Sequence, residues 1–199
     1  MSGRLGDRFA SALRYAHEIH RSDTRKGSST PYVSHLLAVC ALVLEDGGDE
    51  DEAIAALLHD TIEDHADEVT RVDLEARFGT RVAEMVVACT DTPPDYRGGE
   101  KPPWRERKEA YVARLRGKKY PGCRLALADK LHNLRTTVTD YRRQGDGIWK
   151  KFNAGKEDQL WYHGALVEAF REAGATGPLA EEFERCVTEL RRLARAEGS

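Results

Sequence analysis

The chain has 199 residues and a formal net charge of −3 at pH 7. Because a slightly acidic chain is a poor ligand for a polyanion, this balance argues against a nucleic acid polymer as the main partner, although a local basic patch can still bind a small anion. The hydrophobic fraction of 40% is enough for a real core. This length suits one domain, and we expect residues 1–199 to form it, with a helical extension over residues 148–199.

Neither the N-terminal residues nor the apolar runs of the chain suggest a membrane. The first residues contain no apolar signal core, and the longest uncharged apolar run, 53–58, is far too short to span a bilayer. We therefore expect a soluble, cytoplasmic protein. The cysteines form no Cys-x-x-Cys pair, which argues against a thiolate zinc site and favours small hydrophobic residues in a reducing compartment.

Helical periodicity dominates the chain and convincing strand alternation is scarce, so we predict an all-α fold, a compact multi-helix bundle. A third helix is expected to open at Asp49 or Asp51 and to run into His59 and Asp60. Residues 174–178 are the best candidate for a hinge before the last helix. In chain order the predicted helices cover residues 5–20, 31–44, 49–60, 70–79, 82–89, 104–116, 124–143, 157–172 and 179–197.

Local signals support several of these boundaries. Thr30 followed by Pro31 is typical of an N-cap and a first helical residue. Thr70, three residues before Asp73, resembles a capping box in which Asp replaces the usual Glu. Residues 91–103 contain four prolines and two adjacent glycines, which predicts a long loop of the kind that often carries function.

The feature that points most sharply to chemistry is the segment from His59 to Asp64, where an apolar helix closes on a histidine and an aspartate. Residues four apart share a helix face, so we expect Glu63 over His59 and Asp64 over Asp60. These carboxylates repel one another, and acids near a helix C-terminus oppose the helix dipole. A bound cation would relieve both effects; the alternative interpretation is a solvated acidic helix end.

Two other residues weaken that alternative. His35 lies inside an otherwise apolar predicted helix, although a lone helical histidine is usually structural. Asp129 also lies in an apolar helix, and a buried aspartate needs a partner or a metal. On that helix Asp129, Asn133 and Thr136 share one face, away from the predicted buried stripe of Leu127, Leu131, Leu134 and Val138.

Two histidines and two aspartates give a mixed nitrogen and oxygen donor set, which suits manganese, iron or another six-coordinate divalent ion. In their order along the chain, and together with the segments 59–64 and 125–135, these residues resemble the HD superfamily of metal-dependent phosphohydrolases. The match is to the hydrolase domain of the guanosine tetraphosphate (alarmone) synthetase/hydrolases and to the stand-alone small alarmone hydrolases. The matching motifs span residues 25–135. The resemblance implies that the metal ligands are His35, His59, Asp60 and Asp129.

The same resemblance implies roles for six further residues. Glu63 and Asp64 match the acidic pair that positions and activates the attacking water, and Arg25 and Lys26 match the basic pair near the substrate's phosphates. Asn133 and Thr136 match residues that line the nucleotide pocket. The family cleaves the ribose 3′-phosphate ester, releasing pyrophosphate and leaving GDP or GTP, usually with Mn²⁺. Independently of the resemblance, the polar loop that carries Arg25 and Lys26 leads directly to His35 and can bring positive charge to a phosphate.

Several questions stay open at this point. Arg105, Arg107 and Lys108 could add phosphate contacts, although a solvated helix start is the default interpretation. The substrate could be an adenosine 3′-pyrophosphate or the 2′-phosphate of NADPH. A nonenzymatic nucleotide sensor is disfavoured because every ligand and both auxiliary carboxylates are present. A further alternative is an antitoxin that binds its cognate toxin or degrades the product of a toxic synthetase. The sequence predicts no oligomeric state.

Overall fold

The computed structural model describes residues 4–91 and 102–196. These residues form helices and no strand, and their only extended pairing is an isolated bridge between Thr24 and Pro31. The all-α prediction is therefore confirmed. The residues up to Thr90 form one compact unit and those from Asp91 onward form a second, so the single domain stays a prediction. Most of the predicted loop at 91–103 lies outside the described residues.

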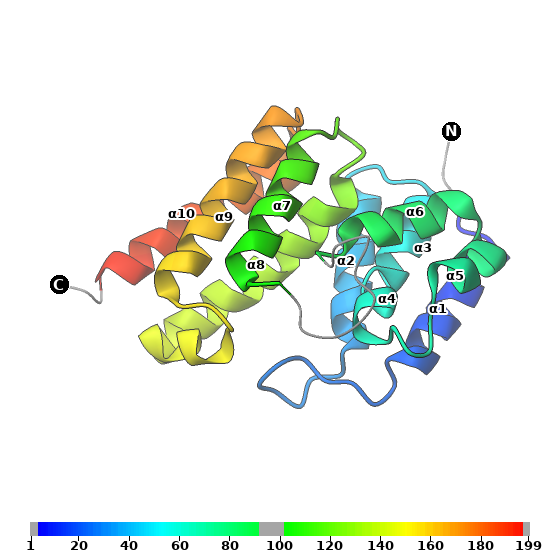
Figure 1. The fold of residues 1–199 in the computed structure, drawn as a ribbon, viewed down its shortest axis with the longest axis horizontal. Helices are drawn as coiled ribbons and strands as arrows, with labels where there is room; N and C mark the ends of the chain where they lie inside the picture. Colours follow the sequence, from blue (N-terminus) through cyan, green and yellow to red (C-terminus); the bar gives the residue numbers. More distant parts are fainter. Residues whose placement is uncertain (1–3, 92–101, 197–199) are drawn as a thin grey trace. The chain divides into compact units, whose positions relative to one another are not determined.

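The first unit is built around one apolar helix, α3. Every residue from Ala53 to Leu58 is buried, and α3 contacts α1, α2 and α6 (Figure 1). A helix that is apolar on all sides is stable only inside a core. The helices of this unit are α1 (Asp7–Ile19), α2 (Val33–Glu45), α3 (Glu50–Leu58), α4 (Thr61–Asp64), α5 (Arg71–Phe78) and α6 (Thr80–Cys89).

The start of α3 is fixed by a capping box and a tight turn. Asp49 accepts a hydrogen bond from the backbone N–H of Glu52 at 3.0 Å, and the Glu52 carboxylate accepts one from the N–H of Asp49 at 3.1 Å. Before it, Gly47 has a φ of +81°, and a Cβ on Gly48 would lie 2.5 Å from Val43 Cγ1. The two glycines thus allow α2 to turn directly into α3, and of the two predicted openings the chain uses Asp49. The predicted capping box at Thr70 is also present.

The predicted start of the second helix at Thr30 and Pro31 is wrong. The backbone N–H of Arg25 donates to the carbonyl oxygen of Thr30 at 2.8 Å, and that of Tyr32 donates to the carbonyl oxygen of Asp23 at 2.9 Å. These bonds close residues 24–31 into a loop, and α2 begins only at Val33. The local N-cap signal is overridden because the backbone of Thr30 is paired across the loop.

The prediction that the third helix continues through His59 and Asp60 is also wrong. Helix α3 ends at Leu58, and Asp60 is the N-cap of the short helix α4. The Thr61 hydroxyl donates to the carbonyl oxygen of Leu58 at 2.7 Å and so satisfies one backbone group at the break. Glu63 and Asp64 therefore belong to a separate one-turn helix and do not extend α3.

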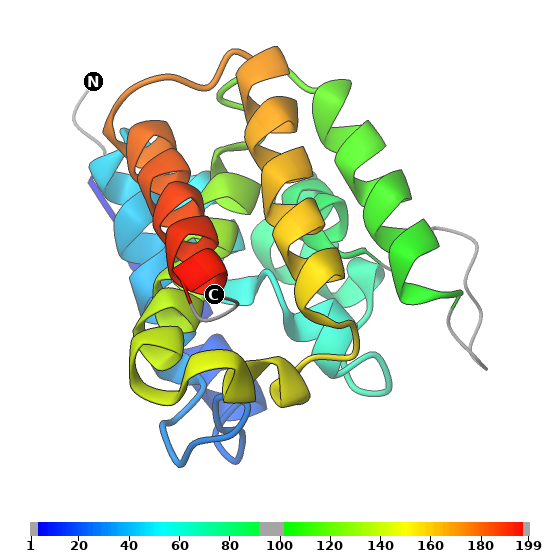
Figure 2. The ribbon, with the colours of Figure 1, turned by 90° about the vertical axis from the view of Figure 1, so that its left-hand side faces the viewer.

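In the second unit, helix α9 lies beside both α7 and α10, as Figure 2 shows in yellow-orange between green and red. Helix α8 contacts α10 and η1. The predicted stripe on α8 is confirmed, since Leu127, Leu131, Leu134 and Val138 are all buried. The helices of this unit are α7 (Trp104–Arg116), α8 (Arg124–Gln144), the 3-10 helix η1 (Gly145–Lys151), α9 (Lys156–Glu172) and α10 (Pro178–Ala196). No described helix has the length and apolar character needed to cross a membrane.

Because α3 is the core of the first unit, truncating one of its side chains should be costly. We expect Leu57→Ala to lower the free energy of unfolding by about 2–5 kcal/mol through lost burial and a cavity. The matched control is Leu37→Ala on α2, where 46% of the residue is exposed; we expect a change within about 0.5 kcal/mol. Urea unfolding followed by circular dichroism measures both. Equal losses would show that α3 is not the core.

Candidate metal centre

Three of the four predicted metal ligands converge within the first unit. His35 lies in α2, whereas His59 and Asp60 follow α3 directly. The Nε2 atoms of His35 and His59 lie 3.6 Å and 2.9 Å from Asp60 Oδ2. The two imidazole rings are 5.1 Å apart, and both histidines are almost completely buried. The break after α3 thus turns His59 and Asp60 toward the helix that carries His35.

The hydrogen bond on the far side of His59 determines what its near side can bind. His59 Nδ1 lies 2.9 Å from the carbonyl oxygen of Ala56. A carbonyl oxygen can only accept, so Nδ1 carries the proton, and in the neutral ring Nε2 is a bare lone pair. That lone pair faces Asp60 Oδ2 at 2.9 Å. Two acceptors this close require a proton or a metal cation between them. The residues present therefore fit a divalent ion, and the Ala56 contact is of the type that orients metal-binding histidines.

Tyr32 also belongs to this site, although no pattern in the sequence pointed to it. Its hydroxyl donates to Asp60 Oδ2 at 2.5 Å, and its ring lies edge-on to His35 at 5.6 Å. The only signal was its place three residues before His35, at the entrance to α2. The hydrogen bond fixes the orientation of the Asp60 carboxylate, a role that outer residues commonly have around metal ligands.

The predicted acidic pair lies directly beyond Asp60. The Thr90 hydroxyl donates to Glu63 Oε2 at 2.9 Å and holds that side chain in place. Partial burial, and then repulsion from Asp60 and Glu63, raises the pKa of Asp64 to about 6. The residue as a whole is nevertheless exposed, and solvent screens part of the repulsion. A cation held by the neighbouring ligands would favour the ionised carboxylate.

The loop at 24–31 brings the predicted basic pair toward the same centre. The Arg25 guanidinium lies 5.7 Å from the ring centroid of Tyr32, the residue bonded to Asp60. Lys26 is exposed, and it is followed by Gly27 with a φ of +75°. The loop thus places Arg25 near the predicted ligands and leaves Lys26 in solvent.

The remaining predicted residues lie on α8, in the second unit. Asp129 is buried, as expected, and its carboxylate accepts from Lys130 Nζ and from Asn133 Nδ2, each at 2.6 Å. Burial lowers the pKa of Lys130, but Asp129 together with Tyr111 and Tyr162 raises it by more, so the ammonium stays charged. Thr136 is exposed and donates to the carbonyl oxygen of His132. That Asp129 is the fourth metal ligand stays a prediction.

The basic residues at the start of α7 have protein partners, contrary to the expectation of a solvated helix start. Arg107 and Lys108 each bond the buried carboxylate of Asp91 at 2.5 Å. Arg105 lies over the ring of Trp161 at 3.3 Å and bonds a carboxylate of α9, Asp158. These three cations are therefore bonded to carboxylates of the second unit.

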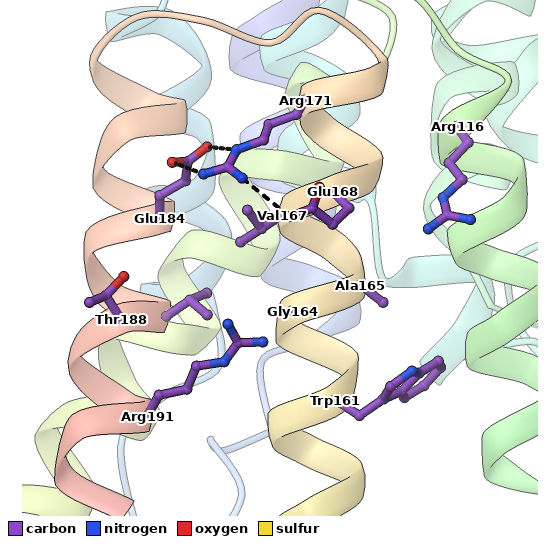
Figure 3. Close-up of a pocket in the computed structure, with 11 residues that line it drawn as sticks. Arg116, Trp161, Gly164, Ala165, Val167, Glu168, Arg171, Glu184, Thr188 and Arg191 are labelled. Carbon is purple, nitrogen blue, oxygen red and sulfur yellow. Dashed lines mark hydrogen bonds and ion pairs between the residues drawn. The ribbon is translucent and has the colours of Figure 1, made fainter.

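A groove of about 430 Å³ between α9 and α10 contains none of the predicted residues (Figure 3). Arg171 donates to both carboxylate oxygens of Glu184 at 2.7 Å, as the dashed lines show. Below this pair, Arg191 lies so close to Gly164 that a Cβ there would be 2.0 Å from its Nη2. The paired charges and the close approach of the two helices indicate that this groove is a packing contact between α9 and α10 and not a catalytic site.

Comparisons with known proteins agree with this picture. The family matched by the chain is described as the HD domain, over residues 12–160. The chain is 33% identical over 180 residues to the mouse guanosine-3′,5′-bis(diphosphate) 3′-pyrophosphohydrolase MESH1, which covers 83% of this chain and 94% of that protein. It is 33% identical over 135 residues to the bifunctional (p)ppGpp synthase/hydrolase SpoT of Escherichia coli K12, covering 65% of this chain and 18% of that one.

Solved structures give the same answer. A structure reported as a metazoan ortholog of SpoT that hydrolyzes ppGpp matches with a TM-score of 0.74 and 26% identity, covering 96% of this chain and 99% of that one. The structure of lmo0812 from Listeria monocytogenes EGD-e matches with a TM-score of 0.69 and 28% identity, covering 81% and 96%. The chain therefore belongs to the HD-domain family and is a phosphohydrolase that depends on a divalent metal ion.

Proposed function

We propose that this chain hydrolyses the 3′-pyrophosphate of guanosine tetraphosphate or pentaphosphate, releasing pyrophosphate and GDP or GTP. The observation that carries the proposal is the convergence of His35, His59 and Asp60 beside two further carboxylates. The relatives that match the chain over most of their length are named for this reaction. The small nucleotide is the partner that this site serves; a cognate toxin stays an untested alternative.

We assign the metal to His35, His59 and Asp60, with Asp129 as the fourth ligand. The mixed donor set favours Mn²⁺ among the divalent ions. When bound, the ion supplies a Lewis acid for a phosphate oxygen and makes water a better nucleophile. The facing acceptors of His59 and Asp60 support this assignment, because they need a proton or a metal cation between them.

Glu63 and Asp64 are the groups that take the proton from the attacking water. A cation held by the neighbouring ligands would keep both carboxylates ionised, the form that accepts a proton, and Asp64 is the exposed residue of the two. Its exposure lets it reach a bound substrate, whereas Glu63 is held by Thr90. Of the two acids, Glu63 is therefore held in place and Asp64 is accessible.

Arg25 and Lys26 neutralise the pyrophosphoryl group under attack, which carries several negative charges, while the nucleoside leaves through its 3′-oxygen and takes up a proton. A group that needs two cations fits a pyrophosphate better than a single phosphate. Asn133 and Thr136 would then line the nucleoside side of the substrate. Burial raises the pKa of Cys40 to about 11, and it also raises the pKa of Cys123 and Cys186. None of these three is an activated thiolate, so we expect water to attack the phosphorus directly.

The reaction can be tested directly. With Mn²⁺ in ¹⁸O-labelled water, guanosine tetraphosphate should yield GDP and intact pyrophosphate in one step, with one oxygen atom from solvent, as read by mass spectrometry. Adenosine 3′-pyrophosphates and NADPH belong in the same panel. Two successive releases of free phosphate without pyrophosphate would rule out the mechanism. Turnover of NADPH alone would make the chain a nucleotide phosphatase.

The fourth ligand has its own test. Asp129→Asn should lose bound Mn²⁺ and nearly all activity, because it removes a ligand charge while keeping the size of the side chain. The matched control is Asp140→Asn on the same helix, where the carboxylate bonds Lys151; it should keep both. Metal content by mass spectrometry, measured on folded protein, decides the matter. Undiminished Mn²⁺ in Asp129→Asn would exclude Asp129 from the ligand set.

Glu63 separates catalysis from metal binding. Glu63→Gln should keep the metal but lose on the order of 10²–10⁴ in kcat, the usual contribution of an acid-base group. The matched control is Glu68→Gln, which changes an exposed glutamate of the same unit and should leave kcat near that of the wild type. If Glu63→Gln is purified without metal, then Glu63 is a ligand or a structural support and not the proton acceptor.

A further inference from the structure

A second group of metal-binding side chains meets at the base of the loop at 24–31. His20 is the C-cap of α1, Asp23 precedes the loop, and His65 follows α4. His20 Nδ1 and His65 Nε2 lie 2.8 Å and 2.7 Å from the same oxygen, Asp23 Oδ2. One donor atom from each residue lies within 4.8 Å of the other two. Two regions that are far apart in the sequence, one with His20 and Asp23 and the other with His65, thus direct two imidazoles and a carboxylate at one point.

The surroundings of this group differ from one side to the other. The His20 side chain is completely inaccessible to solvent, whereas 17% of His65 and 35% of Asp23 remain accessible. Within the part of the chain that the structure describes, His20 Nε2 is buried without a hydrogen-bond partner. Burial lowers the pKa of His20, so its ring is neutral, the form that binds metals. Because Nδ1 is the nitrogen that faces Asp23, a metal ion there would leave the ring proton of His20 on Nε2.

We propose that His20, Asp23 and His65 form a second divalent-metal site, suited to Zn²⁺ and separate from the centre at His35, His59 and Asp60. Two histidine nitrogens and one carboxylate oxygen are a known three-ligand zinc set, in which water takes the fourth position. The accessible side of Asp23 and His65 lets that water enter.

A tetrahedral zinc ion would require only a small movement of these ligand atoms. Bonds of about 2.0–2.1 Å in a tetrahedron separate neighbouring ligand atoms by roughly 3.3 Å. The two nitrogen–oxygen separations of 2.7–2.8 Å must therefore widen by about half an ångström. Asp23 is the partly exposed member and stands at the edge of a loop, so it is the residue that moves.

An ion at this place would stiffen the loop that carries Arg25 and Lys26. The carbonyl oxygen of Asp23 accepts from the N–H of Tyr32, and the His20 ring stacks on the Tyr32 ring at 5.0 Å and 24°. Tyr32 in turn bonds Asp60. The second site is thus structural: it holds the base of the loop and the ring of Tyr32, and it does not touch the reacting atoms.

The test counts metal in the full chain without substrate. Protein stripped with a chelator is loaded with Zn²⁺ or Co²⁺, freed of excess metal by gel filtration and analysed by mass spectrometry, with the visible absorption of Co²⁺ as a second readout. We expect two equivalents in the wild type and one in His65→Ala. His17→Ala, which removes an exposed histidine of α1, is the matched control and should keep two.

The two sites can be separated in the same experiment. His59→Ala should retain one equivalent, and His59→Ala combined with His65→Ala should retain none. If His65→Ala does not fold, as judged by circular dichroism, Asp23→Asn takes its place. One equivalent in the wild type and in His65→Ala alike would overturn the proposal and leave a metal-free hydrogen-bonded triad. Because no substrate is present, that result would leave the proposed hydrolysis untouched.

Discussion

A histidine lone pair that faces a carboxylate oxygen must have a positive charge between them, and the candidate centre depends on this constraint. The bond from His59 Nδ1 to the Ala56 carbonyl oxygen fixes which nitrogen is protonated. As a result, the His59 Nε2 atom that faces Asp60 is a hydrogen-bond acceptor. Tyr32 and His35 surround the same carboxylate from other sides. Without a cation, this arrangement is a cost that the fold has to bear; with one, it becomes a ligand set.

The fold of the first unit delivers this arrangement through the apolar helix α3. Its six consecutive buried residues, 53–58, hold the end of the helix rigidly in the core. The chain then breaks, and the two residues at the break are His59 and Asp60. The packing of α3 thus positions this pair of predicted ligands. The short helix α4 adds Glu63 and Asp64 one turn later.

Local signals made the helices and much of the site predictable from the sequence. The capping box at Thr70 and the apolar spacing on α8 depend only on neighbouring residues, and both the capping box and the buried stripe are observed. The helix break at His59 could not be predicted from residue spacing, because the sequence before and after it fits a helix equally well. The N-cap signal at Thr30 failed because its backbone pairs with Arg25 across a loop.

Long-range contacts explain what the sequence could not reveal. Tyr32 and Asp60 are 28 residues apart, and Asp23 and His65 are 42 apart. Only the packing of α1 and α2 against α3 brings such pairs together, and without it a tyrosine, an aspartate or a histidine is unremarkable. The same holds for the cations of α7, whose partner Asp91 is the first residue of the predicted loop at 91–103.

The central claim is that His35 and His59 bind the metal ion, and electron spin resonance tests it most directly. Mn²⁺ would be added at one equivalent to the His65→Ala variant, which isolates the centre, with histidine labelled with ¹⁵N. Electron spin echo modulation should show coupling to two histidine nitrogens, and to one in His35→Ala. A spectrum with no nitrogen coupling, from manganese surrounded by oxygen alone, would contradict the account.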